Sequence, residues 1–164
     1  MWIHLLRHGI ALDRADPRCP PDPQRPLTDK GVARTRTAAK GLRRLGIEPD
    51  AILTSPYLRA RQTADIVRDV LAPEVPMKQV SALVPEGEPK KMLAAIVATG
   101  FDAPLCVGHA PSLDELATYL AGCGGPVIKL KKSGLCTLRV DTPGRGGGRL
   151  YAVVPPSMLR SLGA

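Results

Sequence analysis

The N-terminal stretch MWIHLLRHG (residues 1–9) places a short apolar run directly before Arg7, His8 and Gly9. An apolar run of this length is typical of a buried strand, and His4 interrupts it too early for a secretory signal. We therefore expect a core strand over residues 2–6 with polar side chains where it ends. His4 alternates onto one face of the sheet, where we expect a structural role.

The same arrangement recurs at two later positions. An apolar run at 51–54 leads into Ser55 and Pro56, and another at 105–107 leads into Gly108-His109-Ala110. Helical patterns separate the runs. We expect helices over 28–45 (capped by Thr28, ended by Gly46), over 55–71, over 89–100 and from 111 onward. This alternation predicts an α/β fold with three layers, in which helices cover both faces of a mostly parallel sheet.

The rest of the chain adds weaker signals. We expect a strand near 77–83, strands over 127–132, 135–140 and 150–154, a hairpin turn at 146–148 and a short helix from 155. The proline-rich stretch 13–26 reads as a surface loop that lines a site. No repeat or linker divides the chain, so we expect a single domain over residues 1–164.

The composition and net charge of the chain limit which classes of function are possible. The formal net charge is +8, which favours anionic partners, but an aromatic content of 3% argues against a nucleic-acid binder that stacks bases. No apolar run approaches the ~20 residues needed to cross a bilayer, so we expect no membrane partner. The four scattered cysteines predict neither disulfides nor zinc, and favour a reduced, cytoplasmic protein. Lys129, Lys131 and Lys132 are expected to form a solvated basic edge, which would also suit an acidic partner protein.

The three strand ends carry the candidate chemistry. Because ligand sites form at the carboxyl ends of parallel strands, Arg7, His8, Arg59 and His109 should converge there. Two guanidinium forks match phosphate oxygens, and helix N-termini at Ser55 and Ala110 would add N–H donors. The arginines would keep His8 neutral and nucleophilic, while His109 stabilises charge on the phosphoryl oxygens. Arg61 points about 200° away from Arg59 on a helix, so we expect it in solvent.

Four segments in order resemble the signature of the histidine phosphatase superfamily, which includes phosphoglycerate mutases and acid phosphatases. They are LRHG (6–9), RPLTDKG (25–31), LTSPYLRARQTA (53–64) and VGHAPSL (107–113). The short length, the stretch LVPEGEP (83–89) and the β-rich end resemble its compact SixA-type branch, the phosphohistidine phosphatases. The resemblance implies phosphorylation of His8, with Arg7, Arg59 and His109 completing the phosphate pocket. It also implies an enzyme without metal or organic cofactor. We expect a monomer. Gly9, Ser55 and Ala110 complete the expected phosphate-binding set.

The general acid is left open. Related mutases and phytases carry an acidic residue that protonates the leaving oxygen, and Glu86 is the first candidate here, with Glu88 second. A basic alkoxide needs such a donor, which typically contributes ~10²–10⁴ in rate. The leaving imidazole of a phosphohistidine is a far weaker base (pKa ~6.5) and departs without one. The loose match at Glu86 therefore favours a phosphorylated protein with a P–N bond as substrate. The alternatives are a broad phosphomonoesterase acting on small phosphate compounds, and a non-catalytic phosphate-binding module.

Overall fold

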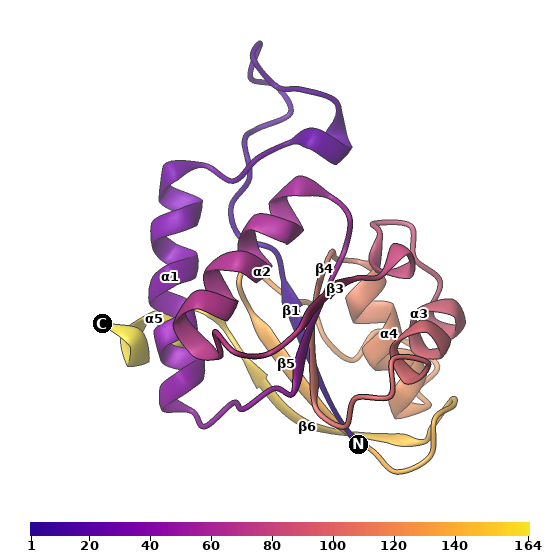
Figure 1. Cartoon of the computed structure of the whole chain (residues 1–164). Coiled ribbons are helices and arrows are strands. Elements are labelled where there is room, and N and C mark those ends of the chain that lie inside the picture. The colour runs from indigo at the N-terminus through magenta and orange to yellow at the C-terminus, as the bar shows by residue number, and fades with distance from the viewer.

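A six-stranded sheet with the strand order β3-β2-β4-β1-β5-β6 forms the centre of the molecule (Figure 1). The computed structural model describes all residues from 1 to 164. Strands β1 to β4 pair in parallel, β5 runs antiparallel to β1, and β6 runs antiparallel to β5. The bounds of the strands are β1 Trp2–Arg7, β2 Ala51–Thr54, β3 Met77–Gln79, β4 Pro104–Gly108, β5 Leu135–Val140 and β6 Gly148–Val154.

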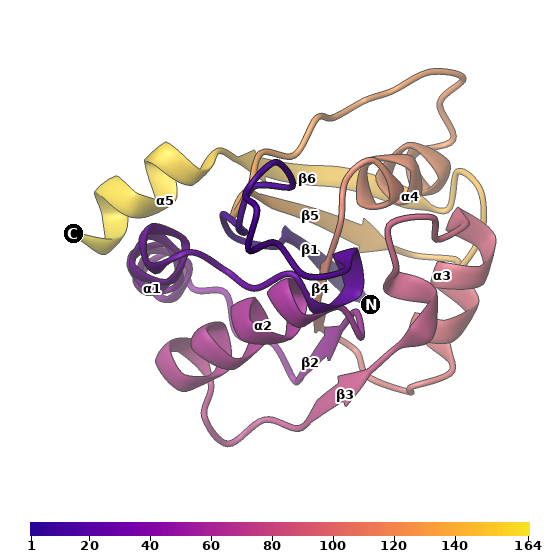
Figure 2. The same ribbon diagram turned by 90° about the horizontal axis from the view of Figure 1, so that it is seen from above.

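Helices cover both faces of this sheet, as Figure 2 shows. Helices α1 (Asp29–Arg44), α2 (Leu58–Leu71) and α5 (Pro156–Gly163) pack on one face, and α3 (Pro89–Val97) and α4 (Ser112–Ala121) on the other. Two short 3₁₀ helices, η1 (Asp22–Gln24) and η2 (Ser81–Leu83), lie in the connections. The predicted three-layer α/β fold with a mostly parallel sheet is confirmed. None of the helices combines the length and apolar character that a membrane crossing requires.

Successive side chains of a strand point to opposite faces of the sheet, so each face has its own hydrophobic core. In β1, Ile3 and Leu5 face α3 and α4, whereas Leu6 faces α1, α2 and α5. In β4, Cys106 joins the first core and Leu105 joins the second. Each fully buried aliphatic side chain contributes ~1.5–3 kcal/mol, so both faces hold the sheet in a fixed register. The strand ends are therefore rigid points for attaching functional side chains.

Three of the strands end at one edge of the sheet. Leu6 of β1 and Thr54 of β2 both lie opposite Val107 of β4. The segments after these strands consequently leave side by side, and the chain after β1 rises above this edge in Figure 1. An antiparallel bridge between Ala11 and Leu27 joins the two ends of the loop that follows β1. A Cβ on Gly31 of α1 would collide with the carbonyl oxygen of Ile10, so glycine permits this close approach.

The predicted strand over 127–132 is wrong. Ile128 and Leu130 are buried in alternation, as in a strand, but the backbone bonds to α4. The amide of Leu130 donates to Oδ1 of Asp114 at 3.0 Å, and that of Val127 donates to Oγ1 of Thr118 at 3.3 Å. Side chains of the helix thus replace a neighbouring strand, and burial alone produced the misleading pattern.

Other boundaries shift by a few residues. Thr28 caps α1 as predicted, with Gly31 N–H donating to its Oγ1 at 3.0 Å. Ser55 does not cap α2 directly. Its Oγ accepts from Tyr57 N–H at 3.3 Å, and the helix begins at Leu58. The strand predicted over 77–83 is shorter, because β3 ends at Gln79 and residues 81–83 form the 3₁₀ helix η2. Strand β6, predicted from residue 150, begins at Gly148.

Candidate active site

His8 lies just past the end of β1 and is 5% exposed. Its Nδ1 lies 2.7 Å from the carbonyl oxygen of Gly9, which can only accept a hydrogen bond. Nδ1 therefore carries the ring proton. Nε of Arg59 lies 3.3 Å from Nε2 of His8, and a guanidinium nitrogen can only donate. The lone pair of His8 is thus on Nε2.

Burial keeps the imidazole of His8 neutral. The pKa of His8 lies well below 6.5, first because burial disfavours the charged ring. The nearby ring of His109 lowers it further, and the Gly9 carbonyl opposes the shift. Arg59 and Arg7 lower the pKa as well, as expected from the sequence, but they rank behind burial. An uncharged Nε2 is a competent nucleophile at neutral pH.

Arg59 is the second residue of α2 and only 2% exposed. Its Nη1 donates to the backbone carbonyl of Asp22 at 2.8 Å, and its Nη2 pairs with Oδ2 of Asp22 at 3.1 Å. The guanidinium also lies 5.0 Å from the ring centre of Tyr57. These contacts fix its Nε beside His8. Arg61 is exposed to solvent, as predicted.

Thr63 ties α2 to the end of β1. Its hydroxyl donates to the carbonyl oxygen of Arg59 at 2.7 Å and accepts from Gly9 N–H at 3.0 Å. The Gly9 amide is therefore occupied by Thr63, and Gly9 does not line the pocket. A Cβ at Gly9 would collide with Oγ1 of Thr35, so this position requires glycine for packing. Gly9, which was expected among the phosphate-binding residues, therefore offers no free amide to the pocket in this structure.

His109 follows β4 and is 2% exposed. Its ring centre lies 5.1 Å from that of His8, and its Nε2 lies 2.9 Å from Oγ of Ser55. Its Nδ1 is buried without a hydrogen-bond partner. Burial, followed by the charge of Arg59, lowers the pKa of His109 to about 3. The ring is therefore neutral before an anion arrives.

Arg7 ends β1 and is anchored from outside the site. Its Nη1 donates to the carbonyl oxygen of Leu130 at 2.8 Å. Its Nε is buried and has no partner. Buried polar atoms are nearly always hydrogen-bonded, so Nε of Arg7 and Nδ1 of His109 are two polar groups that remain available to a ligand.

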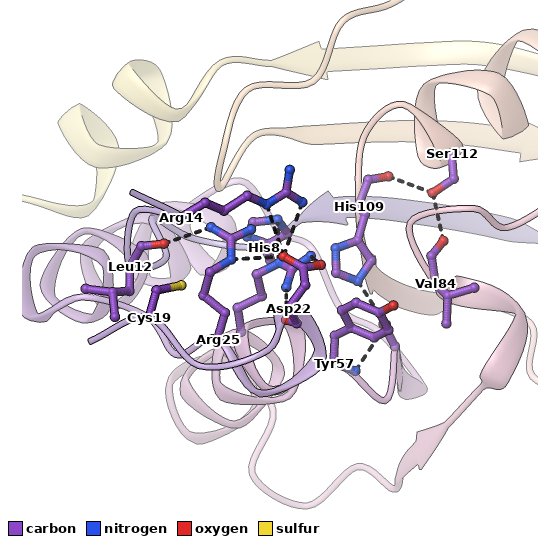
Figure 3. Close-up of polar contacts among 12 residues, drawn as sticks. His8, Leu12, Arg14, Cys19, Asp22, Arg25, Tyr57, Val84, His109 and Ser112 are labelled. Atoms are coloured by element: carbon purple, nitrogen blue, oxygen red, sulfur yellow. Dashed lines mark hydrogen bonds and ion pairs between the residues drawn. The ribbon is translucent and has the colours of Figure 1, made fainter. Parts of the chain in front are cut away.

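These side chains line a pocket of about 370 Å³. Cations and imidazoles dominate its wall, and Figure 3 shows Arg14 and Arg25 paired with the Asp22 carboxylate, with His109 to one side. The lining residues are Arg7, His8, Ala11, Asp13, Arg14, Arg25, Arg59, Pro85, His109, Ala110 and Lys132. Such a wall suits a compact anion with several acceptor oxygens, such as a phosphoryl group.

Arg7, His8, Arg59, His109 and Ala110 therefore meet as the sequence predicted. Ala110 contributes pocket wall instead of a helix N-terminus, since α4 begins at Ser112.

Two other predicted site residues lie outside the pocket lining. Ser55 is fully buried behind His109 and contacts it through Oγ. Glu86 is exposed and does not line the pocket, although its neighbour Pro85 does. Glu88 is also exposed and pairs with Lys91 at 2.7 Å.

Sequence reasoning did not assign the loop residues Arg14, Asp22 and Arg25 to the site. Asp22 pairs with Arg14, Arg25 and the predicted Arg59 at 3.1 Å each, and these residues come together only when the proline-rich loop folds over the pocket. The density of charge in a loop already expected to line a site was the available signal. Lys132 was assigned to a solvated edge, and it lines the pocket because the segment is not a strand. No three His, Cys, Asp or Glu side chains gather as a metal-binding group.

Comparisons with known proteins agree with this geometry. Residues 3–84 match the family model of the histidine phosphatase superfamily (branch 1). Phosphohistidine phosphatase SixA of Escherichia coli is 30% identical over 151 residues, covering 89% of each chain. An uncharacterized protein of Picosynechococcus is 44% identical over 144 residues, covering 85% of each. The structure of the protein histidine phosphatase SixA complexed with tungstate superposes with a TM-score of 0.81 at 29% identity, over 97% of this chain and 99% of that one.

Proposed function

Because the chain belongs to the histidine phosphatase superfamily, in its SixA-type branch, we propose that it hydrolyses phosphohistidine through a phosphorylated His8. The observation that carries the proposal is the state of His8. Its Nε2 holds a lone pair in a cationic pocket, beside the unpaired Nε of Arg7 and Nδ1 of His109. A nucleophile and two free donors then meet one phosphoryl group.

The reaction proceeds in two displacements. Nε2 of His8 attacks phosphorus, the bond from phosphorus to the leaving nitrogen breaks, and a phosphoryl–His8 bond forms. Water then attacks phosphorus, the phosphoryl–Nε2 bond breaks, the proton given up by the water passes to solvent, and inorganic phosphate and neutral His8 are released. Arg7, Arg59 and His109 hold the equatorial oxygens in both steps, where negative charge develops in the transition state.

His109 acts as a neutral donor in this scheme. A Ser55 hydroxyl that donates to Nε2 of His109 leaves the ring proton on Nδ1, where it meets a phosphoryl oxygen. An arriving phosphate dianion raises the pKa of the ring and strengthens the hydrogen bond that its Nδ1 proton donates to the phosphoryl oxygen. Ser55 accordingly positions His109 and does not touch the substrate.

The absence of a buried carboxyl from the pocket wall supports a P–N substrate. The one acidic side chain of the lining, Asp13, is exposed, and its Oδ1 accepts from Ala15 N–H at 2.9 Å. Glu86 does not line the pocket. An alkoxide leaving group would lack a shielded proton donor, whereas a phosphorylated imidazole takes its proton from solvent on the far ring nitrogen and leaves neutral.

We also propose that the chain works as a monomer in the cytoplasm, on a phosphorylated protein. All four cysteines are free thiols, and burial raises the pKa of Cys136 to about 12. Thiols held protonated in this way are inert structural residues of the kind common in reduced compartments.

The deciding experiment compares turnover of a phosphohistidine peptide with that of p-nitrophenyl phosphate and sugar phosphates. We expect fast release from the peptide, ester cleavage slower by at least about 10², and no turnover by His8→Ala. The matched control is His4→Ala, which removes a histidine that bonds Thr137 at 3.0 Å outside the site. Ester cleavage faster than P–N cleavage would make the protein a metabolite phosphatase, and normal activity of His8→Ala would refute the mechanism.

A further inference from the structure

A second concavity of about 460 Å³ adjoins the phosphate pocket. The two share Arg7 and Lys132 as lining residues, so they lie side by side on the surface. The second part is formed by α1, by the segment before β5 and by α5. Its cationic side chains beyond Arg7 are Arg34, Lys131, Lys132 and Arg160, which we call the basic groove, and no carboxylate lines it.

None of the four cations of the basic groove forms an ion pair. Elsewhere the arginines are often neutralised. Arg18 pairs with Asp16 at 2.9 Å, and Arg149 pairs with Asp141 at 2.8 Å. Gathering unpaired like charges around a hollow is unfavourable in the free protein. Burial and the neighbouring charges of Arg7 and Arg25 also lower the pKa of Lys132. An anion in the groove would relieve this repulsion.

The basic groove stands on rigid supports. Ser133 is buried at φ 60°, and its amide donates to the carbonyl oxygens of both Arg7 and His8, at 3.0 and 3.2 Å. Its hydroxyl lies 3.2 Å from Oγ1 of Thr35, the residue after Arg34. The lysine segment and α1 are therefore fastened to the same strand end as the nucleophile.

Helix α5 is held to α1 equally closely. A Cβ on Gly41 of α1 would collide with the carbonyl oxygen of Leu159, so the backbones touch at this point. Arg160 directly follows Leu159, so its backbone is held close to α1, the helix that carries Arg34. The groove is thus a preformed surface, which lowers the entropic cost of binding a partner.

We infer that the basic groove binds an acidic segment of the phosphoprotein substrate, flanking the phosphorylated side chain that enters the pocket. This inference rests on the proposed function and adds the class of partner. A small phosphate compound that fills the first pocket leaves Arg34, Lys131 and Arg160 without a partner, because these three do not line that pocket. A protein chain extends ~3.3–3.6 Å per residue, so residues next to the phosphorylated one reach the adjoining groove.

The lining also disfavours nucleic acid as the occupant. Its apolar members are Ile10 and Pro156, and no aromatic side chain is present to stack bases. Carboxylates on a flexible chain can meet both the point charge of Lys131 and the planar guanidinium groups of the two arginines, which match carboxylate oxygens.

The test uses two matched phosphohistidine peptides, with glutamates or glutamines on both sides of the phosphohistidine, and phosphoramidate as a small P–N substrate without flanks. The variant Arg34→Glu/Arg160→Glu reverses two charges of the groove and touches no residue of the catalytic pocket. The control Arg36→Glu/Arg61→Glu makes the same change in net charge at exposed positions outside the groove. A second groove variant, Lys131→Glu, guards against misfolding of the first.

We expect the wild-type chain to prefer the glutamate peptide by about tenfold in kcat/KM, mainly through KM. The groove variants should lose this preference, keep wild-type turnover of phosphoramidate, and differ from the control pair, which keeps the preference. Equal kcat/KM for both peptides in the wild type, or equal losses in groove and control variants, would overturn the inference.

Binding of the unphosphorylated peptides, followed by fluorescence anisotropy at low salt, separates this inference from the proposed function. The glutamate peptide should bind the wild type and the control pair, and not the groove variants. If no phosphohistidine is hydrolysed but this pattern holds, the proposed function fails and the groove remains an acidic-segment site. If hydrolysis is normal and the pattern is absent, the groove assignment alone is wrong.

Discussion

Nε of Arg59 lies 3.3 Å from Nε2 of His8, so that a fixed donor points at the lone pair of the proposed nucleophile. On the other side of the ring, Nδ1 donates to the Gly9 carbonyl at 2.7 Å. The two contacts select one tautomer and one reactive nitrogen. They also mean that the phosphoryl group must enter between Arg59 and His8, taking over the guanidinium donor as the new bond forms.

The first prediction concerns the phosphorylated atom. Since Nδ1 carries the proton, we expect the phosphoryl group on Nε2 of His8 and none on Nδ1. Histidine side-chain NMR of the protein, phosphorylated with phosphoramidate and kept at alkaline pH, distinguishes the two isomers. The free protein should show His8 with its proton on Nδ1. Phosphorylation at Nδ1 would contradict the assignment of the reactive nitrogen.

The second prediction concerns the planar guanidinium group of Arg59. Lysine keeps the charge but loses the arrangement in which Nη1 and Nη2 hold Asp22 while Nε faces His8. We expect Arg59→Lys to lower kcat by about 10²–10³, the usual cost of one oxyanion donor. Steady-state kinetics on a phosphohistidine peptide provide the measurement. Arg61→Lys on the exposed side of α2 is the matched control and should be silent; a silent Arg59→Lys would remove the guanidinium from the mechanism.

The third prediction concerns Asp22, which has two opposing effects. Burial raises the pKa of its carboxyl, but the arginines, Arg59 first, lower it to a net value below normal, so Asp22 is anionic at neutral pH. Asp22→Asn should remove a negative charge next to the incoming phosphate and lower the inhibition constant for inorganic phosphate by a few-fold. It should also loosen Arg59 and lower kcat by about tenfold.

Inhibition by phosphate and turnover, measured on the same preparation, separate these effects. A change of both constants in the unfavourable direction would show that Asp22 only holds the loop. Asp16→Asn, which frees Arg18 in the same loop outside the pocket, is the control.

Local sequence patterns predicted the features of this fold that depend on interactions between residues close in the sequence. Residues 2–6 and 105–107 are apolar runs bounded by polar residues or glycine, and Thr28 is a helix cap with acidic Asp29 behind it. Each of these patterns involves only a few neighbouring residues, so it can be recognised from the sequence without a structure. Convergence of His8, Arg59 and His109 followed from one topological rule about parallel sheets.

Features that depend on long-range contacts were not predictable in this way. Asp22 meets Arg59 only because the loop after β1 folds back over α2, and no spacing in the sequence encodes that contact. Residues 127–132 alternate like a strand, but Asp114 and Thr118 of α4 take their amides. Burial was also underestimated as the main reason that His8 stays neutral, since it depends on everything packed around the ring.

The fourth prediction assigns a positioning role to Ser55. Its Oγ lies 2.9 Å from Nε2 of His109 and accepts from Tyr57 N–H, which leaves its own proton for the imidazole. Ser55→Ala should lower kcat by about tenfold, since the Nδ1 proton of His109 is no longer fixed. If Ser55 acts through His109, the same change made in His109→Gln should have almost no further effect. Additive losses in this double-mutant cycle would show that Ser55 supports the fold and not the tautomer.

The last prediction follows from the buried histidines. The pKa of His109 falls to about 3 and that of His8 lies well below 6.5, whereas in the unfolded chain both titrate near ~6.5. Between these values the unfolded chain binds more protons, so the free energy of unfolding must fall as the pH drops below about 6.5. Above pH 6.5 both rings are neutral in the folded and in the unfolded chain, so their contribution to the free energy of unfolding does not change with pH.

Denaturant unfolding at several pH values between 6.5 and 4 measures how steeply the free energy of unfolding falls. His109→Gln should reduce this slope by about one proton. Saturating phosphate should weaken this pH dependence, because a bound dianion stabilises the imidazolium and raises its pKa in the folded protein toward the unfolded value. A free energy of unfolding independent of pH between 6.5 and 4 would mean that these rings titrate normally in the folded protein, which would remove the electrostatic basis for a neutral His8.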